Sequence, residues 1–259
     1  MNNYIKFLIK QKNAGFTLVE LIVASVMTFF VVGGAGYGLF IMTRENVASN
    51  AASDTQYNLN RAAEFISDEI RTASAISVSQ TPVTVSSPNG NCGTFTPILT
   101  LTIPFTATSG SSAGTSAPYT VYYYSQAPGS PWLGTNAIYR CGPSLQVTGA
   151  NAGNVSTDAT TGLPVSSTSN ILVDLIATNS SSSCQSGWTA SAGTGFFACI
   201  DNANNKLIEL HLASSALDTQ SNTGLRSSVT DSSGNIIQDA RFTEKANYSI
   251  ITRVAARAN

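Results

Sequence analysis

One long, almost uncharged segment lies between two charged ones at the start of this chain. Residues 1–15 carry three lysines and no acid, and residues 16–43 contain a single charged side chain, Glu20. As a helix, these 28 residues would be about 42 Å long, more than the roughly 30 Å of a bilayer's hydrocarbon core. The sequence therefore predicts a membrane-spanning helix that begins near residue 16.

The charges before and within this segment predict its orientation in the membrane and a need to neutralise Glu20 or keep it at the interface. A short positive segment stays on the cytoplasmic side, so the chain after residue 43 is expected outside the cytoplasm. A carboxylate such as Glu20 inside a bilayer costs about 2–3 kcal/mol unless it stays at the interface or finds a partner. Burial of that carboxylate is tolerable where a second charge neutralises it.

Residues 15–21, Gly-Phe-Thr-Leu-Val-Glu-Leu, resemble the processing signature of type IV prepilins and of the related pseudopilins of secretion systems. The resemblance implies cleavage between Gly15 and Phe16 by a membrane prepilin peptidase, followed by N-methylation of the Phe16 amine. It also implies that Glu20 pairs with the N-terminal amine of a neighbouring subunit during assembly.

Two simpler explanations of the N-terminal segment remain. An ordinary secretory signal peptide would be cut near residues 34–36, although its apolar region is normally 7–15 residues long and should contain no acid in its first turn. A plain signal anchor would leave Glu20 at the interface. Neither explains the seven-residue signature.

The helix is expected to continue beyond the membrane. Apolar residues recur every three or four positions, which is typical of an amphipathic helix: Leu59, Ala62, Ala63, Ile66, Ile70 and Ala73. We therefore predict a removable leader (1–15), a transmembrane half-helix (16–43), an amphipathic half-helix (44–73) and a β-rich extracytoplasmic head (74–259). Four glycines at 33, 34, 36 and 38 either weaken the helix so that it can unwind in a filament or allow close helix approach.

The head is predicted to be antiparallel β-sheet, which gives an α+β, pilin-like fold overall. Segments with alternating or β-branched residues, separated by Gly/Ser/Asn/Pro-rich turns, are expected to be strands: 98–103, 119–124, 137–141, 171–177, 206–213 and 248–254. Residues 149–169 show no period and predict a long surface loop.

Four cysteines lie on the predicted exported side: Cys92, Cys141, Cys184 and Cys199. An even number in an oxidising compartment predicts two disulfides, with three possible pairings. We favour Cys184 with Cys199, which closes a short glycine-containing loop, and this leaves Cys92 with Cys141. A zinc site is disfavoured because the sequence has no C-x2-C pair and a single histidine, His211.

The sequence offers no catalytic constellation, and we predict neither an enzyme nor a cofactor. His211 is expected on a solvated strand face together with Glu209. Residues 201–205 resemble a calcium loop, but Ala203 occupies a ligand position, so a hairpin turn is favoured. Three consecutive tyrosines (122–124) could stack on a sugar. Alternate strand residues point to opposite faces, however, which favours tyrosines that pack in the core on one face and cover the sheet on the other.

Composition fits an exported structural protein. Charged residues make up 10% of the chain, against about 25% in typical domains. Removal of the leader would leave 10 basic and 14 acidic side chains, and this net charge of −4 disfavours nucleic-acid binding. The expected location is the inner membrane, single-pass with the head outside, and afterwards a pilus or pseudopilus.

Residues 60–73 resemble the late helix of the minor subunits called J in type II secretion and W in type IV pili. Weaker similarities lie at Tyr119, at residues 137–140 and at the basic end, 252–257. The resemblance implies a non-enzymatic subunit that helps to start or assemble a filament for motility, adhesion or secretion, with other minor and major subunits as partners. The alternative is a surface adhesin or glycan-binding protein that uses a pilin anchor.

Overall fold

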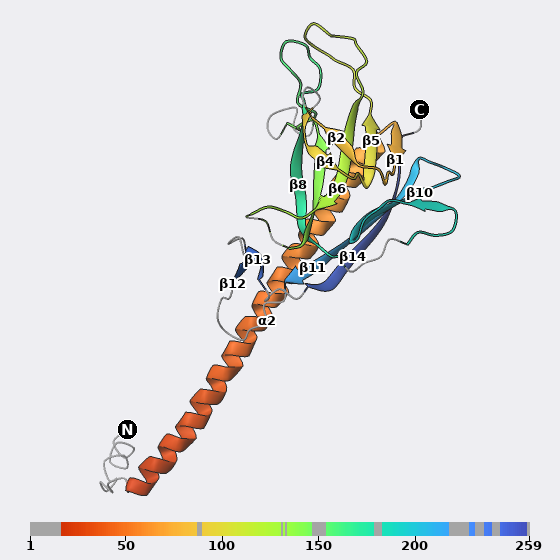
Figure 1. Cartoon of the computed structure of the whole chain (residues 1–259). Helices are drawn as coiled ribbons and strands as arrows, with labels where there is room; N and C mark the ends of the chain where they lie inside the picture. Colours follow the sequence, from red (N-terminus) through yellow and green to blue (C-terminus); the bar gives the residue numbers. More distant parts are fainter. Residues whose placement is uncertain are drawn as a thin grey trace, which may run out of the picture. The chain divides into compact units, whose positions relative to one another are not determined.

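The computed structural model describes residues 17–86, 90–130, 132, 134–146, 154–178, 183–217, 228–230, 236–239 and 244–257. The chain divides into two compact units, Met1–Val47 and Ala48–Asn259. One helix, α2 (Leu18–Thr72), runs through both units, and strands follow it in the second unit (Figure 1).

The strands of the second unit are short at first and become longer towards the C-terminus. In chain order they are β1 (Ala75–Ser77), β2 (Val83–Val85), β3 (Gly90–Asn91), β4 (Gly93–Phe95), β5 (Leu99–Ile103), β6 (Tyr119–Gln126), β7 (Asn136–Gly142), β8 (Ser167–Ile176), β9 (Trp188–Ala190), β10 (Phe196–Asp201), β11 (Leu207–Leu217), β12 (Ser228–Thr230), β13 (Ile236–Asp239) and β14 (Glu244–Ala255).

Most of these strands form one large sheet. Its order is β1-β5-β6-β7-β8-β11-β10-β9, with β14 also paired to β11 and β3 to β8. All these pairs are antiparallel except β3–β8, which is parallel. The strands β2–β4 and β12–β13 form separate two-stranded sheets. A long N-terminal helix followed by a large antiparallel sheet confirms the predicted α+β, pilin-like fold class.

The amphipathic part of α2 packs on one face of this sheet. Every predicted stripe residue is at most 5% exposed, from Leu59 to Ala73. The helix shares one core cluster with alternate residues of the strands, including Leu101, Val121 and Leu210. Because strand side chains alternate between faces, the residues between them point away from the helix.

A second, smaller core lies on the opposite face of the sheet. There Phe95 of β4 stacks on Tyr124 at 4.1 Å between ring centroids, and Tyr124 stacks on Tyr139 at 5.2 Å. Val85 and Cys141 complete the buried cluster. The β2–β4 hairpin thus covers part of the outer face.

Each of the six predicted strand segments lies on an observed strand. Of the predicted loop at 149–169, residues 149–153 lie outside the described part of the chain, and β8 already begins at Ser167. Between them the chain forms turns and the isolated bridges Leu145–Val155 and Thr157–Pro164. The predicted loop is therefore about right for residues 154–166 and wrong for 167–169, which join the sheet.

Candidate functional site

The first described residues form a reciprocal helix cap around Glu20. Thr17 precedes the helix, and its backbone N–H and hydroxyl both donate to Glu20 Oε2 at 3.0 Å. In return, the Glu20 backbone N–H donates to Thr17 Oγ1 at 3.3 Å. This T-x-x-E pattern is a capping box, in which two helix N–H groups without helical partners are satisfied by side chains. The spacing of Thr17 and Glu20 could have revealed it from the sequence, and our sequence analysis missed it.

The other two residues of the predicted processing site, Gly15 and Phe16, lie outside the described residues. The cleavage and methylation assigned to them therefore stay predictions, as does the role of Glu20 in assembly. What the structure adds is the environment of Glu20. In the single chain its carboxylate is exposed and bound by Thr17, one turn into α2.

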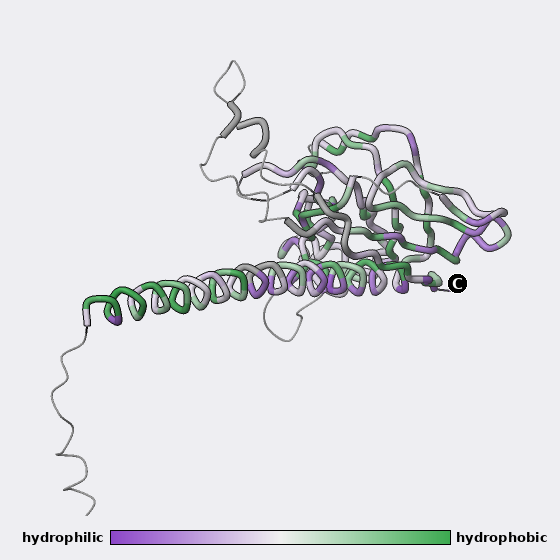
Figure 2. Tube along the Cα trace, turned by 90° about the horizontal axis from the view of Figure 1, so that it is seen from below, coloured by the Kyte–Doolittle hydropathy of each residue, from purple (hydrophilic) through white to green (hydrophobic). Residues whose placement is uncertain are grey.

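The helix that follows has the properties of a membrane span. From Leu18 to Thr43 its mean hydropathy is 2.1, and none of its most apolar stretch is buried within the protein. Figure 2 shows this half of α2 as mostly hydrophobic, with one hydrophilic turn near its start and a few paler turns. Its large side chains are mostly 50–75% exposed, for example Phe29 (75%) and Leu39 (70%).

Polar groups inside this span are satisfied by the helix itself. Thr28 Oγ1 donates to the Ala24 carbonyl at 2.8 Å, and Thr43 Oγ1 donates to the Leu39 carbonyl at 2.6 Å. Ser25 Oγ likewise donates to the Ile22 carbonyl. Hydrocarbon offers no hydrogen-bond partners, so such internal bonds are what a lipid-exposed helix needs.

The four glycines of the span do not interrupt the helix. Gly33, Gly34, Gly36 and Gly38 all lie within α2, and a Cβ atom built on any of them would meet nothing within 4 Å. Packing inside the described chain therefore gives no reason for glycine there. Both explanations from the sequence, unwinding in a filament and close approach of a second helix, remain open.

A buried ionic cluster joins the helix to the sheet. Glu69 of α2 and Arg140 of β7 are 8% and 5% exposed, and Arg140 Nη2 lies 2.7 Å from Glu69 Oε1. Arg140 Nε also donates to both Glu69 oxygens, and its Nη1 donates to the Pro143 carbonyl at 2.9 Å. Tyr123 of β6 donates its hydroxyl to Glu69 Oε2. Sequence analysis missed this cluster.

Protonation states in the cluster follow from burial and charge. Burial, together with the nearby Glu69 carboxylate, raises the pKa of Tyr123 well above its usual value, so its hydroxyl stays a donor. Burial alone would lower the pKa of Arg140, but the hydrogen bond and charge of Glu69 outweigh it and raise that pKa. The cluster therefore consists of the Arg140–Glu69 ion pair and the neutral phenol of Tyr123.

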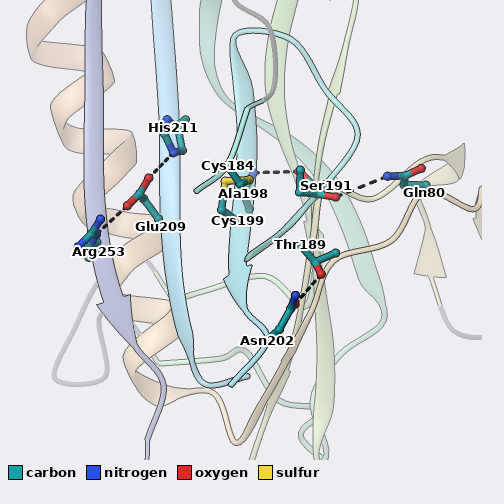
Figure 3. The surroundings of a disulfide bond; sticks show 11 residues. Gln80, Cys184, Thr189, Ser191, Ala198, Cys199, Asn202, Glu209, His211 and Arg253 are labelled. Carbon is teal, nitrogen blue, oxygen red and sulfur yellow. Dashed lines mark hydrogen bonds and ion pairs between the residues drawn. A yellow bond between two sulfur atoms is a disulfide. The ribbon is translucent and has the colours of Figure 1, made fainter. Parts of the chain in front are cut away.

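Both disulfides are present in the favoured pairing. Cys92 is bonded to Cys141 with 6.0 Å between their Cα atoms, and Cys184 to Cys199 with 5.8 Å. The first ties the segment between the short strands β2 and β4 to β7. The second ties the segment before β9 to the middle of β10 (Figure 3).

The environment of His211 differs from its prediction. Alternation in β11 is as expected, with Ile208, Leu210 and Leu212 in the core. The opposite face is not solvated, however, because Glu209 is only 6% exposed. His211 Nε2 lies 2.7 Å from Glu209 Oε1, and Arg253 Nε of β14 lies 2.6 Å from Oε2 (Figure 3). The expected surface position of His211 was wrong because it assumed that the face of the sheet away from the helix is fully exposed to solvent.

Glu209 should make the stability of the second unit depend on pH. Burial raises the pKa of Glu209, but hydrogen bonds and charges from Arg253 and His211 outweigh it, so the pKa lies below its usual value of about 4.5. A carboxylate whose pKa is lower in the folded state than in the unfolded state stabilises the protein at pH values above its unfolded-state pKa. This stabilisation disappears as the pH falls through the folded-state pKa. We therefore expect wild type to have a higher melting temperature than Glu209→Gln at pH 7, with the gap closing as the pH falls below about 4.5.

The matched comparison is Glu64→Gln on the exposed face of α2. Its melting temperature should follow wild type at every pH, because no buried partner depends on that carboxylate. A constant gap between wild type and Glu209→Gln from pH 7 to 3 would show that the charge of Glu209 is not what stabilises the fold.

Other candidate sites from the sequence are structural. Asp201 accepts the N–H of Ala203 at 3.0 Å inside the β10–β11 turn, as favoured above. Among the described residues, no group of three or more His, Cys, Asp or Glu could hold a metal ion. Tyr123 is fully buried in the main core and Tyr124 in the second cluster, with Tyr122 packed beside Phe95. The predicted core-and-cover arrangement of the tyrosines is therefore confirmed.

Comparison with known protein families gives one match. Residues 10–36 match the prokaryotic N-terminal methylation motif, the signal of type IV pilins. No curated protein and no solved structure matches this chain. The match covers the capped start of α2 and most of the apolar span, whereas the head is described by its structure alone.

The methylation motif, the apolar N-terminal helix and the antiparallel sheet behind it agree with one another. The signature placed a single carboxylate at the start of an apolar helix, and Glu20 lies there at the start of an exposed apolar helix. Two disulfides in the head fit an oxidising compartment. Together these findings fit a type IV pilin-like protein, either a pilin or a pseudopilin.

Proposed function

We propose that this chain is a minor pilin-like subunit that helps to start or assemble a type IV pilus-like filament. In this proposal prepilin peptidase removes residues 1–15, the Phe16 amine is methylated, and residues 16–43 hold the protein in the inner membrane. Residues 44–73 then carry the head, 74–259, on the far side. The observation that carries the proposal is the methylation motif, residues 10–36, which extends into an exposed apolar helix.

The head supports a minor rather than a major role. Nearly 190 residues follow α2, and a long connection, residues 104–118, lies between two of the strands. Filament shafts repeat one subunit many times, which favours small, regular heads. A large head is better suited to a few positions at the end of a filament, as expected for the J and W subunits that residues 60–73 resemble.

Purified filaments test the proposal. Sheared filaments from wild-type cells should contain this chain at a small fraction of the main subunit, and a deletion strain should make few or no filaments. Normal filaments in the deletion strain, together with binding of the protein to glycans or surfaces, would instead support the anchored adhesin. Restoration of filaments by the wild-type gene is the control.

A further inference from the structure

The large sheet has one long strand at its border. Border strands are normally short or blocked, because their unpaired N–H and C=O groups can bind another chain. The border strands β1 and β9 obey this rule with three residues each. The border strand β3 has only two residues, whereas β14 has twelve and pairs only with β11 among the described strands.

The free backbone groups of β14 can be assigned from the hydrogen bonds of β11. Ala213 donates its N–H to Gly195 and accepts from Ala177, so both of its backbone groups point away from β14. In an antiparallel pair, when the N–H and C=O of one residue point away from the partner strand, the N–H and C=O of the residue directly opposite point away as well. The partner of Ala213 is Ser249, so both backbone groups of Ser249 point away from β11. At two-residue intervals the same holds for Ile251, Arg253 and Ala255.

These four residues are also exposed. Ser249, Ile251, Arg253 and Ala255 all have exposed side chains, and Ile251 is a large apolar residue with 62% of its surface in solvent. Within the described part of the chain, no backbone hydrogen bond reaches this edge from outside β11. The edge from Ser249 to Ala255 is thus an extended row of donors and acceptors with an apolar side chain at its centre.

Arg253 is the charged residue of this edge, and two contacts hold its side chain in place. Its Nε binds the buried Glu209, and its guanidinium carbon lies 5.7 Å from the centre of the Trp188 ring. The side chain is nevertheless 55% exposed, so part of the fork of five donors faces solvent. A carboxylate is the group that binds such a fork best. Residues 248–255 contain no acid.

We propose that the β14 edge, Ser249–Ala255, is a strand-addition site for an extended, acid-bearing segment of a different pilin-like subunit. Strand addition supplies affinity through main-chain hydrogen bonds and specificity through side chains such as Ile251 and Arg253. A second copy pairing Ser249–Ala255 with the same residues would bring no carboxylate to Arg253, since the one acid of β14, Glu244, lies outside this edge, which favours a different subunit. The inference rests on the proposed function, because it needs a filament partner.

Photo-crosslinking in cells tests this contact in the full-length chain. A photoreactive amino acid at Ser249, on the edge, is compared with the same amino acid at the exposed Thr84 of β2. We expect a crosslinked product at Ser249 and none at Thr84. Mass spectrometry of the product should identify a strand of another pilin-like subunit that contains Asp or Glu.

A proline substitution can block the β14 edge without disturbing the fold. In Ile251→Pro the lost N–H points away from β11, so the β11–β14 ladder is kept, whereas Ile251→Val keeps both the N–H and the apolar character. The crosslink at Ser249 should fall about fivefold or more in the proline variant, since each hydrogen bond is worth about 1 kcal/mol. The valine variant should resemble wild type. Unchanged disulfides and melting temperature show that both variants fold.

The outcomes distinguish this inference from the proposed function. If the chain is in filaments but Ser249 yields no crosslink, or if Ile251→Pro changes nothing, strand addition at β14 is wrong while the assembly role stands. A product made of two copies of this chain, or a partner segment without an acid, also overturns the inference. If wild-type protein is absent from filaments, the proposed function fails and the strand-addition site fails with it.

Discussion

Replacing Glu69 with alanine is expected to lower the free energy of unfolding by about 3–5 kcal/mol, because it leaves Arg140 buried without its partner. Arg140 is 5% exposed, and it donates three hydrogen bonds to Glu69. Tyr123 would lose its acceptor as well. Urea unfolding of the full-length protein in detergent, followed by the fluorescence of Trp132 and Trp188, measures the change.

The neighbouring residue provides the control. Asp68 forms an ion pair of 2.5 Å with Arg71 on the same helix, but both side chains are more than 60% exposed. Asp68→Ala should therefore cost less than about 1 kcal/mol. The double variant Glu69→Leu/Arg140→Met removes both charges and should be more stable than Glu69→Ala alone. Equal effects of Glu69→Ala and Asp68→Ala would show that the buried cluster contributes little to stability.

Glu20→Val is expected to lower incorporation into filaments about tenfold or more, since a buried charge that loses its partner costs about 3–5 kcal/mol. Membrane insertion should be unaffected, because valine is more apolar than glutamate. Cleavage after Gly15 should also continue. Comparison of the protein in sheared filaments with that in membranes measures incorporation.

The cap formed with Thr17 makes a sharper control available. Glutamine at position 20 can still accept the Thr17 hydrogen bonds as the polar member of a capping box, but it carries no charge. If Glu20 acts through its charge, Glu20→Gln should fail like Glu20→Val, and Thr17→Val should still assemble. If the cap is what matters, Glu20→Gln should assemble and Thr17→Val should fail. Failure of cleavage as the main defect would assign Glu20 to recognition by the peptidase.

Local patterns made the helix and most long strands predictable. The spacing from Leu59 to Ala73 matches the buried face of α2, and alternation in 98–103 matches β5. β10 was missed because Phe196–Ile200 is apolar without interruption and all five residues are buried. A strand covered on both faces shows no alternation, so period two cannot reveal it.

Contacts between distant residues could not be predicted in the same way. Glu69 is 71 residues from Arg140 and 54 from Tyr123. Its spacing from Ile66 and Ala73 could place it on the buried face of the helix, but nothing local identifies its two partners. Only the fold brings the three groups together. The cap of Glu20 is the opposite case, since Thr17 lies three residues away and the pattern could have been recognised.

The N-terminus of the mature protein tests the central claim most directly. The full-length chain is isolated from membranes and from filaments, and its terminal peptide is analysed by mass spectrometry. We predict that the terminus is Phe16 and that its amine carries one methyl group. A mature terminus at Tyr37 or nearby, or an intact chain that still begins at Met1, would contradict processing as a pilin-like protein.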